Sequence, residues 1–292
     1  MPELPEVEGL RRFLAGQLIG STVTRAELAS FPALKTFALP LGSVVGLDVE
    51  RVERRGKFLA IGVDGAWVAF HLARAGWLRW YDTVPPAPPK PGRGPIALRM
   101  AFEQPDADAP VGFDLTEAGT QKKLAIYVVA DLAEVPHIAT LGPDPLADGF
   151  TEADFAAALA AHGRTQLKGV LRDQKIFAGI GNAYSDEILH GAKLSPFKLA
   201  GTLTVDELAG LYAAVRGELA GAIERASGKP PAELKDDKRN AMRVHGRKGQ
   251  ACPVCGTTVA EVSFADSFLD YCPGCQTGGK ILADRRMSRL LK

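Results

Sequence analysis

The second and third residues of the chain could carry out covalent chemistry. If the initiator Met1 is removed, the ring nitrogen of Pro2 becomes a free secondary amine. An α-amino group has a pKa of about 8, against about 10.4 for lysine, so part of it is unprotonated and nucleophilic at neutral pH. Its attack on an aldehyde-like carbon gives an iminium ion, which is Schiff-base chemistry. Glu3 supplies a carboxylate one residue away that can pass protons.

The same segment also fits an ordinary helix start. Proline is favoured in the first turn of a helix, and acidic residues are stabilised there by the helix dipole. Pro5, Glu6 and Glu8 supply both features. Taken alone, the segment leaves a catalytic amine and a plain helix N-terminus both open.

The cysteines form a second constellation, because all of them fall into two C-x-x-C pairs separated by residues 256–271 (Cys252, Cys255, Cys272, Cys275). This spacing is typical of a four-thiolate zinc site on a β-hairpin. Four thiolates leave no open coordination position, so we predict one structural Zn²⁺. Redox-active or merely buried thiols are the alternative. Basic residues precede the pairs at Arg247 and Lys248, and follow them at Arg285 and Arg286.

A glycine-containing turn is the third candidate. A helix is predicted to run to about Arg172, and a second helix to begin near Asn182. Gly179 and Gly181 allow close backbone approach, and Asn182 stands where a helix cap belongs. Backbone N–H groups at a helix start, together with an Asn amide, can bind a phosphate. A plain helical hairpin with a glycine turn is the structural alternative.

Length and composition bound the protein class. A chain of 292 residues suggests two or three domains, and 35 Lys and Arg against 34 Asp and Glu give a net charge of +1. Basic residues are therefore concentrated locally: the segment from Lys235 onward contains 11 basic and six acidic residues. No apolar run is long enough for a membrane span, and no signal-peptide pattern opens the chain. We expect a cytoplasmic protein with reduced cysteines.

The periodicity of apolar residues predicts the elements that position these groups. Residues 5–18 have helical spacing. Between Thr22 and about Ala133 the pattern is strand-like, which favours a β-sandwich. A boundary is expected at residues 142–146, and beyond it residues 151–161 and 204–226 are Ala/Leu-rich and helical, the second starting with the capping-box spacing of Thr204 and Glu207. The predicted fold class is therefore α+β with several domains.

Four segments match a known pattern when they are taken in order: residues 2–8, 55–59, 179–187 and 244–249 followed by the cysteines. They resemble the opening, the lysine-bearing strand, the helix-two-turn-helix and the zinc-finger approach of the formamidopyrimidine-DNA glycosylase / endonuclease VIII family of base-excision-repair enzymes. The resemblance covers nearly the whole chain. It implies an N-terminal catalytic β-sandwich domain (1–133), a helical domain with the helix-two-turn-helix (134–240) and a zinc finger with a basic C-terminal extension (241–292).

The resemblance also implies roles for individual residues. Pro2 would attack C1′ of the damaged nucleotide, Glu3 would donate a proton at the sugar as the base leaves, and Lys57 would contact phosphate and transfer protons. The nucleotide must leave the base stack for its C1′ to reach Pro2. Asn182 would hold a backbone phosphate, and Arg247 and Lys248 would contact DNA.

The chain departs from the family pattern at three places. Ser267 stands where the family often has a phosphate-binding arginine, and a serine cannot clamp phosphate as a guanidinium does. Arg74 stands where a void-filling methionine is expected. The loop at residues 119–124 has no aromatic wedge, although Lys122 can keep a charged contact to the opposite strand. The extension at residues 285–292 is predicted to be a short basic amphipathic helix.

The leading hypothesis is a monomeric DNA glycosylase with AP-lyase activity, acting on double-stranded DNA that contains damaged bases or abasic sites. Its location would be cytoplasmic, and nucleoid-associated when bound to DNA. The alternative is a non-catalytic or weakly active protein that binds lesions or abasic sites on the same fold. A third class, RNA-binding proteins, shares helix-two-turn-helix elements. Retention of Pro2, Glu3 and Lys57 argues against both alternatives.

Overall fold

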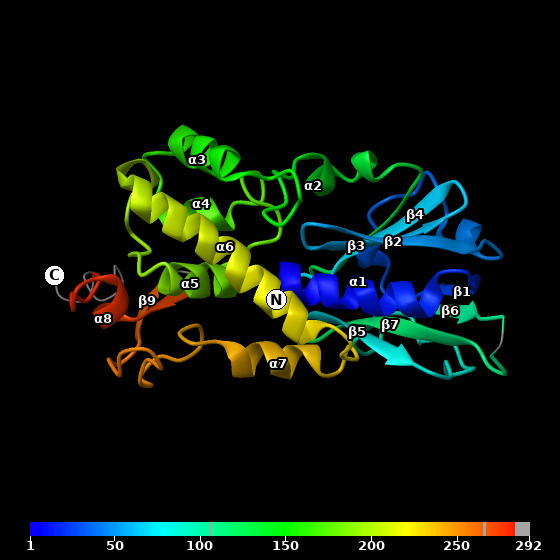
Figure 1. Ribbon diagram of the computed structural model, residues 1–292. Helices are drawn as coiled ribbons and strands as arrows, with labels where there is room; N and C mark the ends of the chain where they lie inside the picture. The colour runs from blue at the N-terminus through cyan, green and yellow to red at the C-terminus, as the bar shows by residue number, and fades with distance from the viewer. Residues whose placement is uncertain (106, 265–266, 284–292) are drawn as a thin grey trace. The chain divides into compact units, whose positions relative to one another are not determined.

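A computed structural model describes residues 1–105, 107–264 and 267–283 (Figure 1). The chain forms two compact units. Unit 1 comprises Met1–Leu141 and Ala226–Lys235, and unit 2 comprises Gly142–Arg225 and Asp236–Lys292. The helix predicted at residues 285–292 lies outside the described residues, and the three domain boundaries given above stay a prediction.

Unit 1 is a β-sandwich with a long N-terminal helix, α1 (Leu4–Leu18). Both of its sheets are antiparallel and four-stranded. In spatial order, one sheet contains β1 (Thr22–Leu28), β6 (Ile96–Glu103), β7 (Val111–Glu117) and β5 (Gly76–Tyr81). The other contains β2 (Val49–Arg55), β3 (Phe58–Val63), β4 (Ala66–His71) and β8 (Ala125–Val129). Short helical segments η1 (Phe31–Ala33) and η2 (Leu41–Val44) lie between β1 and β2, and η3 (Leu132–Glu134) and α2 (Pro136–Ala139) follow β8.

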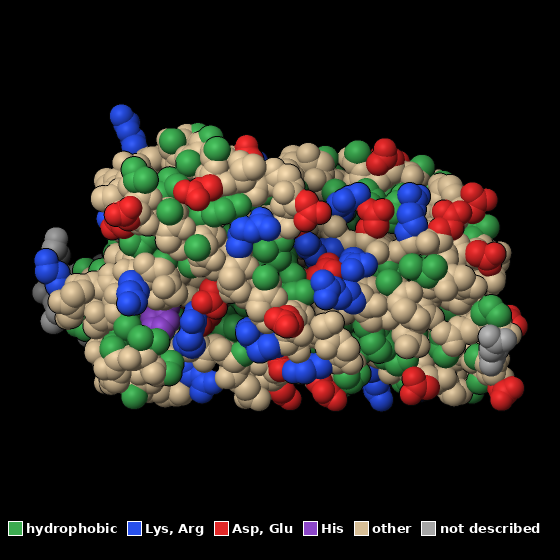
Figure 2. Space-filling view, in the orientation of Figure 1, with side chains coloured by type: hydrophobic (Ala, Val, Ile, Leu, Met, Phe, Trp, Pro, Cys, Tyr) green, Lys and Arg blue, Asp and Glu red, His purple; other side chains and the backbone are tan. Residues whose placement is uncertain are grey.

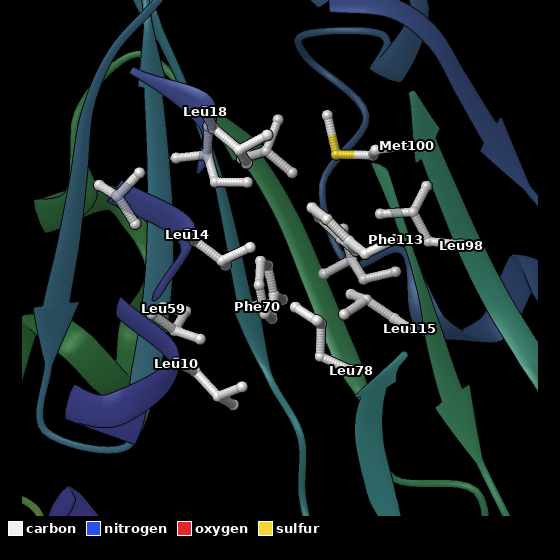
Figure 3. Close-up of a cluster of buried hydrophobic side chains, with 14 of the residues drawn as sticks. Leu10, Leu14, Leu18, Leu59, Phe70, Leu78, Leu98, Met100, Phe113 and Leu115 are labelled. Atoms are coloured by element: carbon white, nitrogen blue, oxygen red, sulfur yellow. The ribbon is translucent and has the colours of Figure 1, made fainter. Parts of the chain in front are cut away.

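The core of unit 1 joins α1 to both sheets. The α1 leucines Leu10, Leu14 and Leu18 recur at intervals of four, which places them on one helix face, and all three are fully buried. Figure 3 shows them pointing toward side chains from both sheets. The Phe70 ring of β4 lies 6.0 Å, between centroids, from the Phe113 ring of β7. Burial of this face fixes α1, and with it the N-terminal residues, on the sandwich.

Unit 2 is helical and ends in a β-hairpin. Its elements are α3 (Glu152–Ala161), α4 (Leu167–Arg172), α5 (Asn182–Gly191), η4 (Ala200–Thr202), most of α6 (Val205–Ala226), most of α7 (Leu234–Ala241), β9 (Ala260–Ser263), β10 (Phe268–Tyr271) and α8 (Pro273–Gln276). The antiparallel β9–β10 pair forms the hairpin. None of the helices in the described part of the chain is long and apolar enough to cross a membrane.

The predicted fold class is confirmed: a β-sandwich with an N-terminal helix, a helix-two-turn-helix region and a zinc-finger hairpin. The capping box before α6 is also present, with Thr204 N–H donating to Glu207 Oε2 at 2.9 Å and Glu207 N–H to Thr204 Oγ1 at 3.2 Å. Two local expectations were wrong. Gly181 is the N-cap of α5 and Asn182 is its first helical residue. Lys57 lies in the turn between β2 and β3 and not on a strand.

Candidate active site and zinc centre

The N-terminal residues of unit 1 are held at the start of α1. Pro2 is buried, Glu3 is the N-cap of α1 and only 2 % exposed, and Met1 is 46 % exposed. The Glu3 N–H donates to Glu6 Oε2 at 2.9 Å, which completes a capping box. The segment is therefore a well-capped helix start that holds Pro2 and Glu3 in buried positions, and the catalytic amine stays a prediction.

Lys57 occupies a two-residue hairpin turn. Arg55 pairs with Phe58 across the β2–β3 ladder, which leaves Gly56 and Lys57 as the two turn residues. Gly56 has φ +56°, a left-handed conformation that favours glycine and suits a primed hairpin turn. The Lys57 side chain is nonetheless 8 % exposed. A tight turn thus fixes the position of this buried ammonium.

An ion-pair cluster ties this turn to α1. The Arg54 guanidinium donates to Glu8 Oε2 on α1 at 3.1 Å and to the Gly56 carbonyl oxygen at 3.3 Å. Arg11 and Arg12 also bind the Glu8 carboxylate. Burial raises the pKa of Glu8, but hydrogen bonds and charges from these arginines outweigh it and hold the pKa below its usual value. The Lys57 turn is therefore anchored to the helix that carries Pro2 and Glu3.

His71 lies beside Lys57 at the end of β4. It faces Phe58 across the β3–β4 ladder, with ring centroids 4.8 Å apart. Burial, then the positive charges of Lys57 and His137, lower the pKa of His71 to about 4. The neutral ring accepts a hydrogen bond at Nδ1 from the Ala73 N–H at 3.2 Å. Ala73 has φ +51°, a strained conformation for a non-glycine residue, so this bond helps hold the turn that leads to Arg74.

Two of the segments that depart from the family pattern lie together in the structure. Arg74 and Ala75 share a pocket of about 280 Å³ with residues 117–121 and Lys123. The buried Glu117 carboxylate shapes this loop by accepting the N–H groups of Lys123, at 2.8 Å, and Leu124, at 3.0 Å. The Lys122 ammonium donates to the Glu117 carbonyl oxygen. Lys123 therefore lines the pocket with Arg74, and the contact of Lys122 to the opposite DNA strand stays a prediction.

The expected phosphate-binding residue of unit 2 contacts the hairpin. Asn182 Nδ2 donates to the Phe268 carbonyl oxygen of β10 at 2.8 Å, and its Oδ1 atom is buried without a hydrogen-bond partner in the described part of the chain. Gln174 holds the preceding turn, since its Oε1 accepts the Gly179 N–H at 2.9 Å and its Nε2 donates to Ile180 O at 2.6 Å. Asn182 therefore joins the helical turn to the finger.

Arg247 and Lys248 are both engaged within unit 2. The Arg247 guanidinium donates to the carbonyl oxygens of Arg239, Asn240 and Met242 near the end of α7, at 3.2 to 3.3 Å. Cations are favoured at helix C-termini, so this contact stabilises α7. Lys248 Nζ lies 2.9 Å from Glu261 Oε1, with its side chain 64 % exposed. Of the two, Lys248 is the better placed to reach an external phosphate.

The four cysteines form the zinc site predicted from their spacing. The Sγ atoms of Cys252 and Cys275 are 3.9 Å apart, and those of Cys255 and Cys272 are 3.3 Å apart. Four sulfurs around a tetrahedral Zn²⁺ would be about 3.8 Å from one another. Hydrogen bonds from Thr257 lower the pKa of the Cys255 thiol to about 6, which favours the thiolate that zinc requires. The donor set therefore fits a structural zinc ion.

Sequence reasoning missed a buried polar network behind the finger. The Glu187 carboxylate of α5 accepts the N–H groups of Arg243, Val244 and His245, each at 2.9 Å. The neighbouring Asp186 accepts from Lys168 Nζ at 2.5 Å and lies 2.7 Å from His245 Nδ1. Acidic residues in the motif at 179–187 were visible in the sequence, but their partners lie up to 84 residues away.

Comparisons with known proteins agree along the whole chain. Family models match the formamidopyrimidine-DNA glycosylase N-terminal domain at residues 1–114, the formamidopyrimidine-DNA glycosylase H2TH domain at 141–230, and a zinc finger found in FPG and IleRS at 249–278. A formamidopyrimidine-DNA glycosylase of Symbiobacterium thermophilum is 34 % identical over 98 % of this chain and 93 % of its own. An uncharacterized formamidopyrimidine-DNA glycosylase-like protein of Mycobacterium tuberculosis is 54 % identical over 55 % of this chain and all of its own.

Solved structures are similar over the same extent. A MutM (Fpg) protein from Thermus thermophilus aligns with a TM-score of 0.76 and 30 % identity, covering 96 % of this chain and 100 % of that one. A Lactococcus lactis Fpg in complex with a THF-DNA and an inhibitor aligns with a TM-score of 0.81 and 25 % identity, covering 94 % and 100 %.

Proposed function

Because the chain belongs to the formamidopyrimidine-DNA glycosylase family, as its sequence predicted, we propose that it excises damaged, oxidised bases from DNA and cleaves the abasic strand through a Schiff base at Pro2. One observation carries the proposal furthest. The Glu8–Arg54 pair fixes the Lys57 turn against α1, the helix whose N-terminus holds Pro2 and Glu3.

The proposed reaction begins when removal of Met1 frees the Pro2 nitrogen. That nitrogen attacks C1′ of the flipped nucleotide, the glycosidic bond breaks, and the base leaves with the bonding electron pair. The Pro2 N–H proton passes to the departing base, Glu3 in its acid form donates a proton to the sugar ring oxygen, and the C1′–O4′ bond breaks. The resulting iminium ion acidifies the C2′ protons. Loss of one such proton then expels the 3′ phosphate by β-elimination, and Lys57 contacts phosphate and transfers protons at this stage.

DNA binding is proposed to come from local groups in each unit. The surface in Figure 2 shows lysine and arginine side chains interspersed with acidic ones, in keeping with the net charge of +1. Arg74 and Lys123 at the pocket of unit 1, and Asn182 and Lys248 in unit 2, are the candidate contacts. Solved relatives bound to an abasic-site DNA support DNA as the partner. Binding as a monomer is part of the proposal.

A weakly active lesion-binding protein is the second candidate, and Ser267 favours it. Without a guanidinium at this position the chain lacks one expected contact to the lesion's phosphate. We therefore expect β-elimination products to dominate and the second, δ-elimination to be slow. The same assay decides both questions, because the two eliminations leave strand ends of different length and charge.

The test is a duplex panel carrying one oxidised purine, one oxidised pyrimidine or one abasic site. Base release and strand cleavage are measured for the wild-type chain and for Glu3→Gln, with Asp64→Asn in an exposed turn as the matched control. We expect Glu3→Gln to lower base release by about 10² to 10⁴-fold. Asp64→Asn should match the wild type. If no duplex shows base release or cleavage while DNA binding is retained, the glycosylase proposal is contradicted. The lesion-binding protein is then the better description.

A further inference from the structure

His190 is a buried histidine that lies against the zinc site. It is the next-to-last residue of α5 and is 3 % exposed. Its Nε2 atom lies 3.3 Å from Cys252 Sγ, and its Nδ1 atom is buried without a hydrogen-bond partner among the residues that the structure describes. We propose that His190 is a positioning residue of the zinc centre, which donates an Nε2–H···Sγ hydrogen bond to the Cys252 thiolate and ties the metal to helix α5.

The negative charge of a four-thiolate zinc site makes a hydrogen-bond donor to sulfur favourable. Four thiolates on one Zn²⁺ leave an excess of negative charge, which N–H and O–H donors to sulfur offset. Cys272 Sγ accepts the Cys275 N–H at 3.4 Å, and Cys255 receives hydrogen bonds from Thr257. Cys252 is 2 % exposed, so water has little access to its sulfur. His190 supplies the donor there.

Zinc binding would fix the tautomer of His190. A metal-bound thiolate offers only lone pairs, so a hydrogen bond requires the proton on Nε2. The other tautomer would set a nitrogen lone pair against the sulfur lone pairs. The proton position on His190 is therefore a direct test of the hydrogen bond.

Three contacts from one face of α5 reach the finger. Asn182, Asp186 and His190 are spaced four residues apart, which aligns them along the helix. Asn182 Nδ2 donates to Phe268 O at 2.8 Å, and Asp186 Oδ2 accepts the Asp270 N–H at 3.2 Å. His190 extends this row to the first cysteine turn. Loss of His190 should therefore loosen the metal while the hairpin contacts remain.

A direct zinc–His190 bond is the competing arrangement, because His190 Nε2 and the Sγ atoms of Cys252, Cys272 and Cys275 all lie within 4.8 Å of one another. The sulfur pairs argue against it. Each cysteine of the first pair approaches one of the second, at 3.3 and 3.9 Å, so four thiolates are available as ligands without the histidine. A structural zinc ion takes four ligands.

The test uses the full chain loaded with ¹¹³Cd²⁺ and labelled with ¹⁵N-histidine. We expect the NMR spectrum to show His190 protonated at Nε2, with a small coupling from that proton to ¹¹³Cd through the sulfur. The signal should vanish in His190→Phe. A His190 ring protonated at Nδ1 alone would overturn the proposal, and so would a large one-bond ¹⁵N–¹¹³Cd coupling, which identifies a ligand.

Zinc release to a competing chelator gives a second readout. His190→Phe should lower zinc affinity and speed release by about tenfold or more. His190→Gln, whose amide can donate to the same sulfur, should restore most of the loss, whereas the exposed control His162→Gln should behave as the wild type. Equal release from His190→Phe and the wild type would overturn the proposal. If His190→Phe does not fold, the spectrum of the wild-type chain decides.

Discussion

The Lys57 turn of unit 1 and the α5–finger network of unit 2 both bury charged groups, but they use them differently. In unit 2 the buried Glu187 carboxylate is saturated by three backbone N–H groups and Arg243, so its charge holds two segments together. In unit 1 the positive charge of Lys57 helps to lower the pKa of the neighbouring His71. The first arrangement suits stability and the second suits chemistry. Substitutions in the two regions should therefore fail in different ways.

The largest effect on stability is expected at Glu187. Glu187→Gln removes a buried charge from its backbone N–H donors and from Arg243, and losing one member of a buried ionic network costs about 3–5 kcal/mol. The free energy of unfolding of unit 2, from urea denaturation, should fall by that amount. The exposed Glu224→Gln on α6 is the control. A loss equal to the control would show that the network contributes nothing.

Lys57 should show the opposite behaviour. Lys57→Met keeps the length of the buried stem and removes the ammonium, so cleavage of an abasic duplex should fall by about 10²-fold. DNA retention and the unfolding free energy should change far less. The measurement compares single-turnover cleavage with binding to the same duplex, and the exposed Lys90→Met serves as control. Equal losses of cleavage and binding would indicate that Lys57 only contacts a phosphate and takes no part in the chemistry.

A smaller, pH-dependent effect is expected at His71. Its pKa is about 4 in the folded protein, against about 6.5 in an unfolded chain. Between these values the unfolded chain binds more protons, so the free energy of unfolding should fall as the pH drops from 6.5 to 4, by up to about 3 kcal/mol. His71→Asn keeps an acceptor for Ala73 N–H without titrating, and should flatten this dependence. Denaturation at several pH values would show it, and identical slopes in both proteins would contradict it.

The sequence predicted the features that depend on near neighbours. The C-x-x-C pairs, the capping box at Thr204 and the α1 leucines are local patterns, and all three are present. The resemblance to the family added the order of the domains and the chemistry expected of Pro2. It rests on several motifs taken together, and no single segment is enough to establish it.

What the sequence did not predict depends on distant partners. The Glu187 contacts span 56 to 58 residues, and no periodic pattern marks them. Helix α7 was missed because most of its residues are charged, although Leu234 at its start packs into the core of unit 1. Lys57 was expected on a strand, but a left-handed Gly56 closes the hairpin one residue before it.

Borohydride trapping on an abasic duplex shows whether the Pro2 nitrogen forms the Schiff base. The mature chain is compared with one that carries an N-terminal extension, in which the Pro2 nitrogen is an amide. Of these two chains, we expect only the mature one to form a covalent adduct, mapped to Pro2 by mass spectrometry. Pro2→Gly, which keeps a primary amine, should form a partial adduct. An equal adduct with the extended chain, or an adduct mapped to Lys57, would contradict it.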